Sequence, residues 1–554
     1  MSQNICLAQS IEELDFILKK ISEPVKVVPL DLSTHLYCIY NKINYYNPID
    51  FIKKDFHLKS ISESEKLING IDFGNLNSNA IEKKYTSFIR YRFHKTYFLV
   101  ELIKKINDFN KIGKIYISGW QRYTESFSEK NYFLSYLVKN ILKNFNISEL
   151  SPEKYVYKEK KNFKFSLEYK KKIKGKTIII SSLGYKLSRI LIYAVKNNYK
   201  ILIIDSQVSL IKKIIFVLLG IKFIKFKSNN EILENEIIIP NINFKVKEID
   251  YSKILNHKKN QELKSLNVLN AKYSAIKDFL KKNKDLSMIF SNTPLGIAGL
   301  LIEGASINSI PSICINHGTV SKSFDHFDEI YKKNNAEKNF GGKAKYFSIQ
   351  SKIMKDSLAT HKIKGKTIET GNILFQEENR KKKYFIMYAT TLKDLDSLQF
   401  LGDEMFYEFV DNLYLFEKLS VKNGFNFLVK LHPDQKKHLV LLKKIFKKLK
   451  FTISDLGKNL QKTLLTISYS STVIEDSLYS GVPVILFDKW KRYKHCDSQL
   501  NPNLKNEAIY YVVNDRDLLA AIDSIKDSSK FNFNNYIYSG KSSENIKKLF
   551  YKII

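Results

Sequence analysis

Three segments of the chain place reactive polar side chains directly after apolar runs that are typical of buried strands. In the first, Phe427–Leu431 leads into His432 and Pro433. Proline favours an extended conformation in the residue before it, so the strand is expected to end with the His432 imidazole at the carboxyl edge of a sheet. An imidazole there can donate to a phosphate or carboxylate oxygen, or cap a turn. The sequence leaves both readings open.

The second segment joins a strand, Leu464–Ser468, to a helix that begins after a run of hydroxyl side chains. Serine and threonine commonly cap a helix start, and the free N–H groups at that start also attract anions. The segment therefore predicts a helix cap or a phosphate site. The candidate nucleotide-binding residues are Ser468, Ser470, Ser471, Thr472 and Asp476, together with Lys430, His432 and Pro433 of the first segment.

The third segment is a strand, Ile313–Asn316, followed by His317, Gly318 and Thr319. An imidazole with a pKa near 6.5 can act as a general base towards a hydroxyl group, and glycine allows close backbone approach. His317 is therefore a catalytic candidate, with a structural turn as the alternative. Gly318 and Thr319 are acceptor-site candidates.

Four weaker candidates and three acidic residues complete the set. Thr390 and Thr391 follow a strand and could touch a pyrophosphate, while Gly184 and Tyr185 follow another and could line an acceptor site. Glu303, late in an apolar helix, is either a base facing a cleft or a solvated position. Asp394 and Asp396 have the spacing of a metal-binding pair, but their place at a helix start favours a helix-dipole role. We therefore predict no metal site and no cofactor.

The elements that must position these residues alternate between strand and helix from Thr177 onwards. Continuous apolar strands separated by helices favour parallel sheets covered on both faces. The expected strands are Thr177–Ser182, Ile201–Asp205, Glu236–Pro240, Met288–Ser291, Ser312–Asn316, Lys345–Ile349, Tyr384–Ala389, Phe427–Leu431, Leu464–Ser468, Val482–Phe487 and Tyr510–Val513. Two doubly wound sheets in tandem would place a ligand cleft between them, at the carboxyl ends of the strands. The His432 and Ser470 segments would then be consecutive strand ends of one sheet.

The polar stretch near 370–383 divides the two strand series, which predicts three regions. Residues 173–375 would form a Rossmann-like acceptor domain, and residues 376–554 a Rossmann-like nucleotide-donor domain. Residues 1–172 would form an additional α/β region, part of the acceptor domain or appended to it. Its expected strands are Val25–Val28, His35–Tyr40 and Lys114–Ser118, and its last residues, 151–172, read as a linker or exposed arm.

Composition limits the partners. The formal net charge is +35 over 554 residues, but the lysines are spread along the chain without a nucleic-acid-binding motif, so we expect no nucleic acid partner. A basic surface of this kind suits anionic substrates or a peripheral contact with an anionic membrane. Ile211–Phe226 carries four lysines and reads as a buried helix followed by a strand, with a membrane-facing helix as the alternative. Four separated cysteines and no visible signal peptide predict a cytoplasmic protein. A peripheral location at the inner face of the cytoplasmic membrane is the alternative.

Taken in order, the segments at His317, at Lys430–Pro433 and at Tyr469–Ser471 with Asp476 resemble the signature of GT-B-fold bacterial surface-polysaccharide transferases. The CDP-glycerol glycerophosphotransferases share similar HGT, HP and YSS segments. The sialyl and Kdo transferases, which use CMP-sugars, share a similar HP and serine motif. The resemblance covers mainly 285–490, and the paired-acid-plus-glycine motif of the sialyltransferases is matched only in part, by Glu303-Gly304.

The resemblance implies a metal-independent GT-B glycosyltransferase of capsule or lipopolysaccharide synthesis. It would transfer a CMP-activated nonulosonic acid or Kdo to a glycan or lipid-linked acceptor, with His432, Ser470 and Ser471 on the donor phosphate. Polyol-phosphate transfer from a CDP-polyol keeps the same fold, and so does a sugar-nucleotide 2-epimerase. A non-catalytic basic binding protein is the alternative of a different class.

Overall fold

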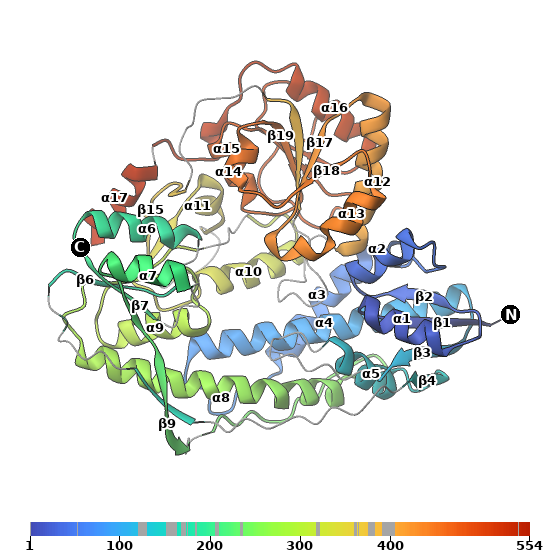
Figure 1. Cartoon of the computed structure of the whole chain (residues 1–554), viewed down its shortest axis with the longest axis horizontal. Coiled ribbons are helices and arrows are strands. Elements are labelled where there is room, and N and C mark those ends of the chain that lie inside the picture. The colour runs from blue at the N-terminus through green and yellow to red at the C-terminus, as the bar shows by residue number, and fades with distance from the viewer. Residues whose placement is uncertain are drawn as a thin grey trace.

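The computed structural model contains three parallel sheets with their helices (Figure 1). It describes residues 2–52, 54–119, 130–150, 163–167, 173, 175–182, 185–204, 210–232, 236–316, 322–358, 363, 365–374, 383–390, 405–540 and 542–553. The last two sheets along the chain belong to two Rossmann-like domains, and the first belongs to an N-terminal domain.

The sheet of the first Rossmann-like domain has the strand order β15-β14-β13-β12-β6-β7-β8, and all neighbours are parallel. Counted from β6 as the first strand, the six strands from β8 to β14 follow the Rossmann order 3-2-1-4-5-6. The order reverses between β6 and β12. The strands are β6 (Thr177–Ile180), β7 (Lys200–Ile204), β8 (Lys222–Ile224), β12 (Met288–Ser291), β13 (Ser312–Cys314), β14 (Tyr346–Ile349) and β15 (Lys366–Glu369).

The sheet of the second Rossmann-like domain has the order β18-β17-β16-β19-β20-β21, again all parallel. Counted from β16, this is the order 3-2-1-4-5-6, with its reversal between β16 and β19. The strands are β16 (Phe385–Ala389), β17 (Phe427–Lys430), β18 (Lys450–Thr452), β19 (Thr463–Ser468), β20 (Val484–Phe487) and β21 (Ile509–Val512). The predicted GT-B architecture of two Rossmann-like domains is thus confirmed.

Helices cover both sheets because the central strands are buried on both faces. Those of the first Rossmann-like domain are α6 (Tyr185–Lys196), α7 (Leu210–Leu218), α8 (Ser252–Lys282), α9 (Gly296–Ile307), α10 (His326–Phe340) and α11 (Lys352–Leu358). Those of the second are α12 (Phe406–Asn423), α13 (Leu439–Ile445), α14 (Leu456–Leu460), α15 (Val473–Tyr479) and α16 (Asp515–Lys526). The last helix, α17 (Ser542–Ile553), lies beside α6 and buries Leu549 and Phe550 in the core of the first Rossmann-like domain (Figure 1). It was predicted with the donor domain.

The N-terminal domain has its own parallel sheet, in the order β2-β1-β3-β4. Its strands are β1 (Gln3–Ala8), β2 (Lys26–Pro29), β3 (Ile112–Ser118) and β4 (Ile147–Leu150), and its helices are α1 (Ile11–Lys20), α2 (Leu32–Tyr40), α3 (Lys54–Asn69), α4 (Asn79–Phe109) and α5 (Lys130–Ile141). The long helix α4 packs against α8 and α9, and α2 packs against α13. The N-terminal domain therefore contacts both Rossmann-like domains.

Several predicted elements differ from the structure. His35–Tyr40 is helical rather than a strand, because Asp31 caps α2 by accepting from the Thr34 amide at 2.8 Å. Residues 236–240 are irregular, since the side chains of Asn267 and Asn75 accept from the amides of Ile237 and Ile238 in place of a neighbouring strand. Within the predicted linker, β5 (Phe163–Leu167) pairs with β9 (Phe226–Ile232).

Residues 211–226 do form a helix followed by a strand, but the helix is not buried. Six large apolar side chains between 211 and 219 are exposed. Within the described part of the chain, no helix is long and apolar enough to cross a membrane.

Candidate functional site

The carboxyl ends of the central strands in the first Rossmann-like domain carry buried hydroxyl groups. The Ser181 amide donates to the Phe290 carbonyl at 2.9 Å, and the Ile315 amide donates to the Ser291 carbonyl at 2.7 Å, so the ends of β6, β12 and β13 are held together. The side-chain hydroxyls of Ser181 and Ser182 are inaccessible to solvent and have no hydrogen-bond partner among the described residues. Buried polar atoms are normally paired, so unpaired ones at a strand edge make this edge a candidate site for a polar ligand.

Asn316, the residue after β13, is the centre of the next group of contacts. Its carbonyl accepts from Lys186 Nζ at 2.8 Å and from Gln350 Nε2 at 3.1 Å. Its side-chain oxygen accepts from Cys314 Sγ at 2.9 Å, while its Nδ2 has no partner within the described part of the chain. Because Lys186 lies in the first turn of α6 and Gln350 follows β14, the contacts tie these two elements to the end of β13.

Lys186 also lies in the electrostatic field of two carboxylates from the second Rossmann-like domain. Burial lowers the pKa of Lys186, while Asp476 and Glu475 of α15 raise it. Burial raises the pKa of Asp476 to about 7, and the charge of Lys186 opposes that rise. Asp476 also accepts from Asn372 Nδ2 at 3.3 Å, just beyond β15. A carboxyl group that titrates near neutral pH therefore stands at the junction of the two Rossmann-like domains.

Glu475 and His495 form a second buried pair beside this acid. His495 Nε2 lies 3.6 Å from Glu475 Oε1, which is too long for a good hydrogen bond. Neither side chain has a hydrogen-bond partner among the residues that the structure describes. We call the group Ser181, Ser182, Lys186, Asn316, Glu475, Asp476 and His495 the junction cluster. It has unpaired buried polar atoms on both sides of the domain junction.

Other polar residues at the edge of the second sheet hold the strand ends together. Ser468 Oγ donates to the Ala389 carbonyl at 3.1 Å, and the Thr390 amide donates to the Lys430 carbonyl at 3.3 Å. Ser471 Oγ accepts from the Val473 amide at 3.3 Å, as expected where α15 begins. Ser470, Ser471 and Thr472 are half-buried, whereas Ser468 is fully buried.

His432 lies on a more open part of the same edge. Its side chain is 50% exposed, its Nδ1 lies 3.1 Å from Asp434 Oδ2, and it caps the short 3-10 helix Pro433–His438. Lys430 Nζ donates to the Leu431 carbonyl at 2.8 Å, and burial lowers the pKa of Lys430 while Asp455 raises it. The His432 and Ser470 segments are not adjacent strand ends, because β16 lies between β17 and β19. They are therefore separated by roughly 10 Å, two strand spacings.

Glu303 lies away from the junction cluster. It is buried, and its two oxygens accept from Ser78 Oγ at 2.7 Å and from the Ala80 amide at 2.9 Å. It thereby stabilises the start of α4 and joins α9 to the N-terminal domain. This placement gives Glu303 a structural role.

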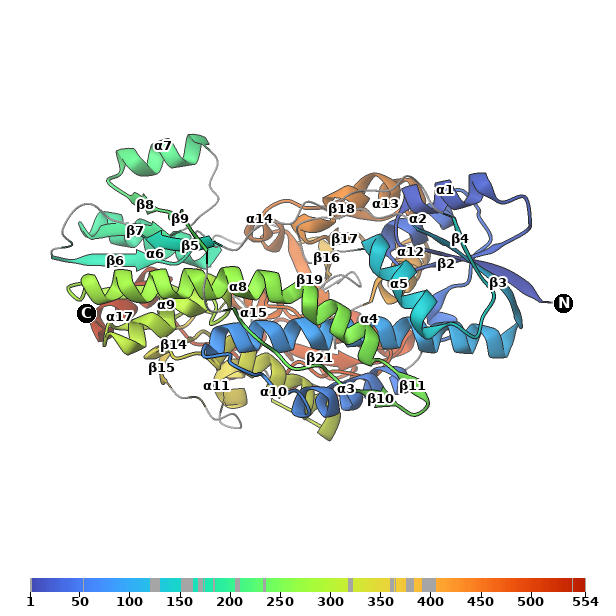
Figure 2. The same cartoon turned by 90° about the horizontal axis from the view of Figure 1, so that it is seen from below.

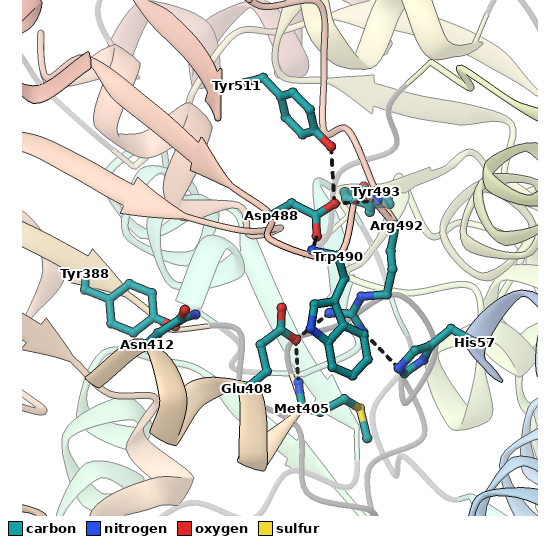
Figure 3. A network of polar contacts seen from close by, with 10 residues as sticks. All are labelled: His57, Tyr388, Met405, Glu408, Asn412, Asp488, Trp490, Arg492, Tyr493 and Tyr511. Carbon is teal, nitrogen blue, oxygen red and sulfur yellow. Dashed lines mark hydrogen bonds and ion pairs between the residues drawn. The ribbon is translucent and has the colours of Figure 1, made fainter. Parts of the chain in front are cut away.

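A buried arginine network fastens the second Rossmann-like domain to the N-terminal domain (Figure 3). Arg492, in the loop after β20, donates to Glu408 Oε2 at 2.5 Å and lies 3.4 Å from His57 Nε2 of α3. Its guanidinium group lies over the rings of Trp490 and Tyr469, 4.8 and 5.0 Å from their centroids. The neighbouring carboxylate of Asp488 accepts from the amides of Trp490 and Tyr493.

Several predicted site residues fall outside the described residues. These are Gly184, His317, Gly318, Thr319, Thr391, Asp394 and Asp396. Their flanking residues Lys186 and Asn316 are described and meet in the junction cluster. Within the described ranges, no group of three His, Cys, Asp or Glu side chains could hold a metal ion.

Sequence reasoning missed Lys186, Asn316, Asn372 and Arg492. Asn316 and Lys186 each adjoin a predicted residue, so extending each strand-end motif by one residue would have included them. Asn372 follows the last strand of its sheet, in a stretch read only as a domain boundary. Arg492 carried no signal, since a lone arginine in a loop does not reveal a buried carboxylate 84 residues away.

Comparison with known proteins does not assign the chain to a family. No family model matches it. A uronate isomerase from Brachyspira hyodysenteriae is 28% identical over 128 residues, so the chain spans only 26% of that relative and the match covers 22% of the chain. Among solved structures, a UDP-GlcNAc 2-epimerase from Methanocaldococcus jannaschii (16% identity, 68% of this chain, 100% of that one, TM-score 0.38) is similar.

Two further solved structures show a similar level of likeness. One is MurG from Acinetobacter baumannii, at 9% identity, 68% of this chain, 100% of that one and a TM-score of 0.33. The other is the wall teichoic acid polymerase TagF, at 14% identity, 69% of this chain, 89% of that one and a TM-score of 0.34. Likeness this distant says nothing about what the chain binds or does.

Proposed function

We propose that the chain is a glycosyltransferase that uses a nucleotide-activated sugar. The observation that carries the proposal is the junction cluster, with its unpaired buried polar atoms at the carboxyl ends of two sheets of Rossmann order. Ligands of doubly wound sheets bind outside those ends, at the point where the strand order reverses. Two such edges at one junction suit a reaction between a nucleotide-linked donor and a second substrate.

The donor would bind at the order reversal between β16 and β19 of the second Rossmann-like domain. Thr390 and Thr391 follow one of these strands, and Ser470, Ser471 and Thr472 follow the other. His432 and Lys430 lie one strand further along, so they would contact the far end of a phosphate-containing group rather than the atoms that Ser470 contacts. The resemblance supports a CMP-activated nonulosonic acid or Kdo as donor. Polyol-phosphate transfer from a CDP-polyol is the alternative reaction.

The acceptor would approach from the first Rossmann-like domain, past Ser181, Ser182, Gly184 and Tyr185. Its hydroxyl oxygen would attack the anomeric carbon of the donor, and the bond from that carbon to the phosphate oxygen would break. The hydroxyl proton would pass to Asp476, whose pKa of about 7 suits a general base, or to His317. The Lys186 ammonium group would balance negative charge on the departing phosphate. A glycan or lipid-linked acceptor of a bacterial surface polymer fits this scheme.

The most direct experiment is a thermal-shift screen of the full chain with CMP, CDP, UDP and GDP. A ligand that binds only the folded state raises the melting temperature. We expect CMP to stabilise the chain most and His432→Ala to reduce the shift. A shift with UDP alone would contradict the CMP-sugar donor, and a His432→Ala variant with full nucleotide affinity would remove His432 from the site. No shift with any of the four would overturn the nucleotide-dependent reaction.

A product assay separates the three reactions that share this fold. Sugar transfer forms a glycosidic bond, polyol-phosphate transfer forms a phosphodiester, and epimerisation needs no acceptor. We expect Asp476→Asn to lower turnover by about 100-fold or more, as loss of a general base does. Asp523→Asn, a change in an exposed carboxylate on α16, is the matched control and should leave turnover unchanged.

A further inference from the structure

Helix α7 turns its apolar face towards solvent. Ile211, Ile214, Ile215 and Leu218 follow the i, i+3, i+4, i+7 spacing of one helix face, and all four are exposed, Ile211 at 73% and Leu218 at 81%. Val217 and Leu219 extend the exposed surface. In Figure 2 the helix lies on the outside of β8, away from the rest of the chain. We call these six side chains the α7 apolar surface.

The opposite side of the helix is anchored to the domain. The Phe216 ring stacks on Phe223 of β8 with centroids 6.3 Å apart, and both pack against the core of the first Rossmann-like domain. Ile221, just past the helix, is 1% exposed. The helix therefore has a fixed position in the fold, with its most apolar face left uncovered. Exposed apolar groups that gather in this way mark an interaction surface.

Lysines follow the α7 apolar surface along the chain. Lys222 of β8, Lys225 between β8 and β9, and Lys227 of β9 are all exposed, and Lys213 Nζ lies 6.0 Å from the centroid of the Phe223 ring. The whole chain carries a formal net charge of +35. A second copy would bring like charges together at a shared surface, whereas an anionic surface would attract them. A partner that matches both features has an apolar interior and a negatively charged surface.

We infer that α7 is a membrane-docking helix that lies in the interface of an anionic lipid bilayer. The combination of an apolar helix face and flanking lysines is the one that binds such an interface. The helix has nine residues, fewer than the roughly 20 needed to span a bilayer, so it would lie in the plane of the headgroups. This inference stands apart from the proposed reaction, because lipid binding needs neither nucleotide nor acceptor.

Sedimentation of the full chain with vesicles tests the inference. We expect binding to vesicles of phosphatidylcholine with phosphatidylglycerol, weaker binding to phosphatidylcholine alone, and loss of binding as salt is raised. The variant Ile214→Ser/Leu218→Ser should bind the anionic vesicles at least about tenfold more weakly. The variant Lys225→Gln/Lys227→Gln should lose about fivefold per lysine, since each basic residue near an anionic surface contributes separately.

A matched control uses exposed apolar residues elsewhere on the chain. Val421 and Val440, on α12 and α13 of the second Rossmann-like domain, are 66% and 64% exposed. Val421→Ser/Val440→Ser should bind vesicles as the unmodified chain does, and all variants should keep their melting temperature because they change exposed side chains. The inference is overturned if the unmodified chain ignores anionic vesicles or if the α7 variant binds them fully. It is equally overturned if the α7 variant only converts a dimer to a monomer, which would identify a second copy as the partner.

Discussion

The second Rossmann-like domain is held at two junctions of opposite character. Towards the N-terminal domain, Arg492 lies 3.4 Å from His57 Nε2 of α3, and its buried ion pair with Glu408 and its aromatic contacts hold it in place within the second Rossmann-like domain. Towards the first Rossmann-like domain, the carboxyl group of Asp476 titrates near neutral pH, and Glu475 and Asn316 keep unpaired buried atoms within the described part of the chain. We call the first contact the arginine joint and keep the name junction cluster for the second.

The difference separates a permanent contact from one that a ligand would complete. A buried ion pair with good geometry is costly to break, because removing one partner strands the other charge. Unpaired buried polar atoms carry a free-energy cost that a ligand or ordered water relieves when it supplies the missing hydrogen bonds. Substrate binding is therefore expected at the junction cluster, while the arginine joint keeps its structure.

The largest expected effect is on the arginine joint. Arg492→Met leaves Glu408 buried without its partner, so the free energy of unfolding should fall by about 3 to 5 kcal/mol. Urea unfolding of the full chain measures this loss. The double variant Arg492→Met/Glu408→Gln should recover part of the stability, because it no longer buries an isolated charge.

A half-exposed ion pair on the same domain supplies the control. Lys489 Nζ lies 2.8 Å from Asp411 Oδ2, with the two side chains 23% and 40% exposed. Lys489→Met should cost no more than about 1 kcal/mol, since water screens such pairs. Equal costs for Arg492→Met and Lys489→Met would show that burial does not make the Arg492–Glu408 pair more costly to break than an exposed one.

The junction cluster should respond to pH rather than to simple loss of a contact. Burial raises the pKa of Asp476 from 3.8 to about 7, so the folded chain binds this proton more tightly than the unfolded chain does. Its contribution to stability is greatest below pH 4 and declines as pH rises to 7. The full shift corresponds to about 4 kcal/mol, and we expect about 2 to 3 because the side chain keeps some exposure.

Asp476→Asn removes this titration. The variant should equal the unmodified chain near pH 4 and be more stable at pH 7 to 8, as measured by urea unfolding across that range. The exposed pair partner Asp523 serves again as control, and Asp523→Asn should keep the original pH profile. If Asp476→Asn kept the same profile as the unmodified chain, the proposed general base would not titrate near neutral pH.

The same contrast explains how far the sequence could predict the structure. Strand ends are local, since an apolar run followed by His432-Pro433 or by Ser470-Ser471 already predicts where a strand stops. The two Rossmann-like domains and most of their strands follow from that pattern. The partners of a side chain, by contrast, can lie far away in the sequence. Glu303 occupies an apolar helix as predicted, yet its partners Ser78 and Ala80 lie more than 200 residues earlier.

Errors in the predicted elements have the same origin. His35–Tyr40 is apolar enough for a strand, and only the Asp31 cap makes it a helix. The Ile211–Phe226 segment was expected to be buried because it is apolar, but hydrophobicity alone does not say which face meets the core. The order of β17, β16 and β19 in the sheet differs from their order in the chain, which separated two segments expected to be neighbours.

The smallest expected effect tests the N-terminal contact in acid. His35 lies between Tyr45 and Phe406 of α12, and neither ring nitrogen has a hydrogen-bond partner among the described residues. Burial lowers the pKa of His35 from 6.5 to about 3, so the unfolded chain binds this proton more tightly. Stability is lost as pH falls below 6.5, by about 1 to 2 kcal/mol at pH 5.

His35→Leu should abolish that loss, and at pH 5 the variant should be more stable than the unmodified chain. At pH 7 the two should differ by no more than about 1 kcal/mol, because the leucine fills similar space and gives up no hydrogen bond. Val440→Ser, at an exposed side chain that does not titrate, should leave the acid profile unchanged. Acidification from pH 7 to pH 5 would then strengthen the junction cluster through Asp476 while weakening the N-terminal contact through His35. An acid profile that Asp476→Asn and His35→Leu change in the same direction would show that the two contacts are not independent.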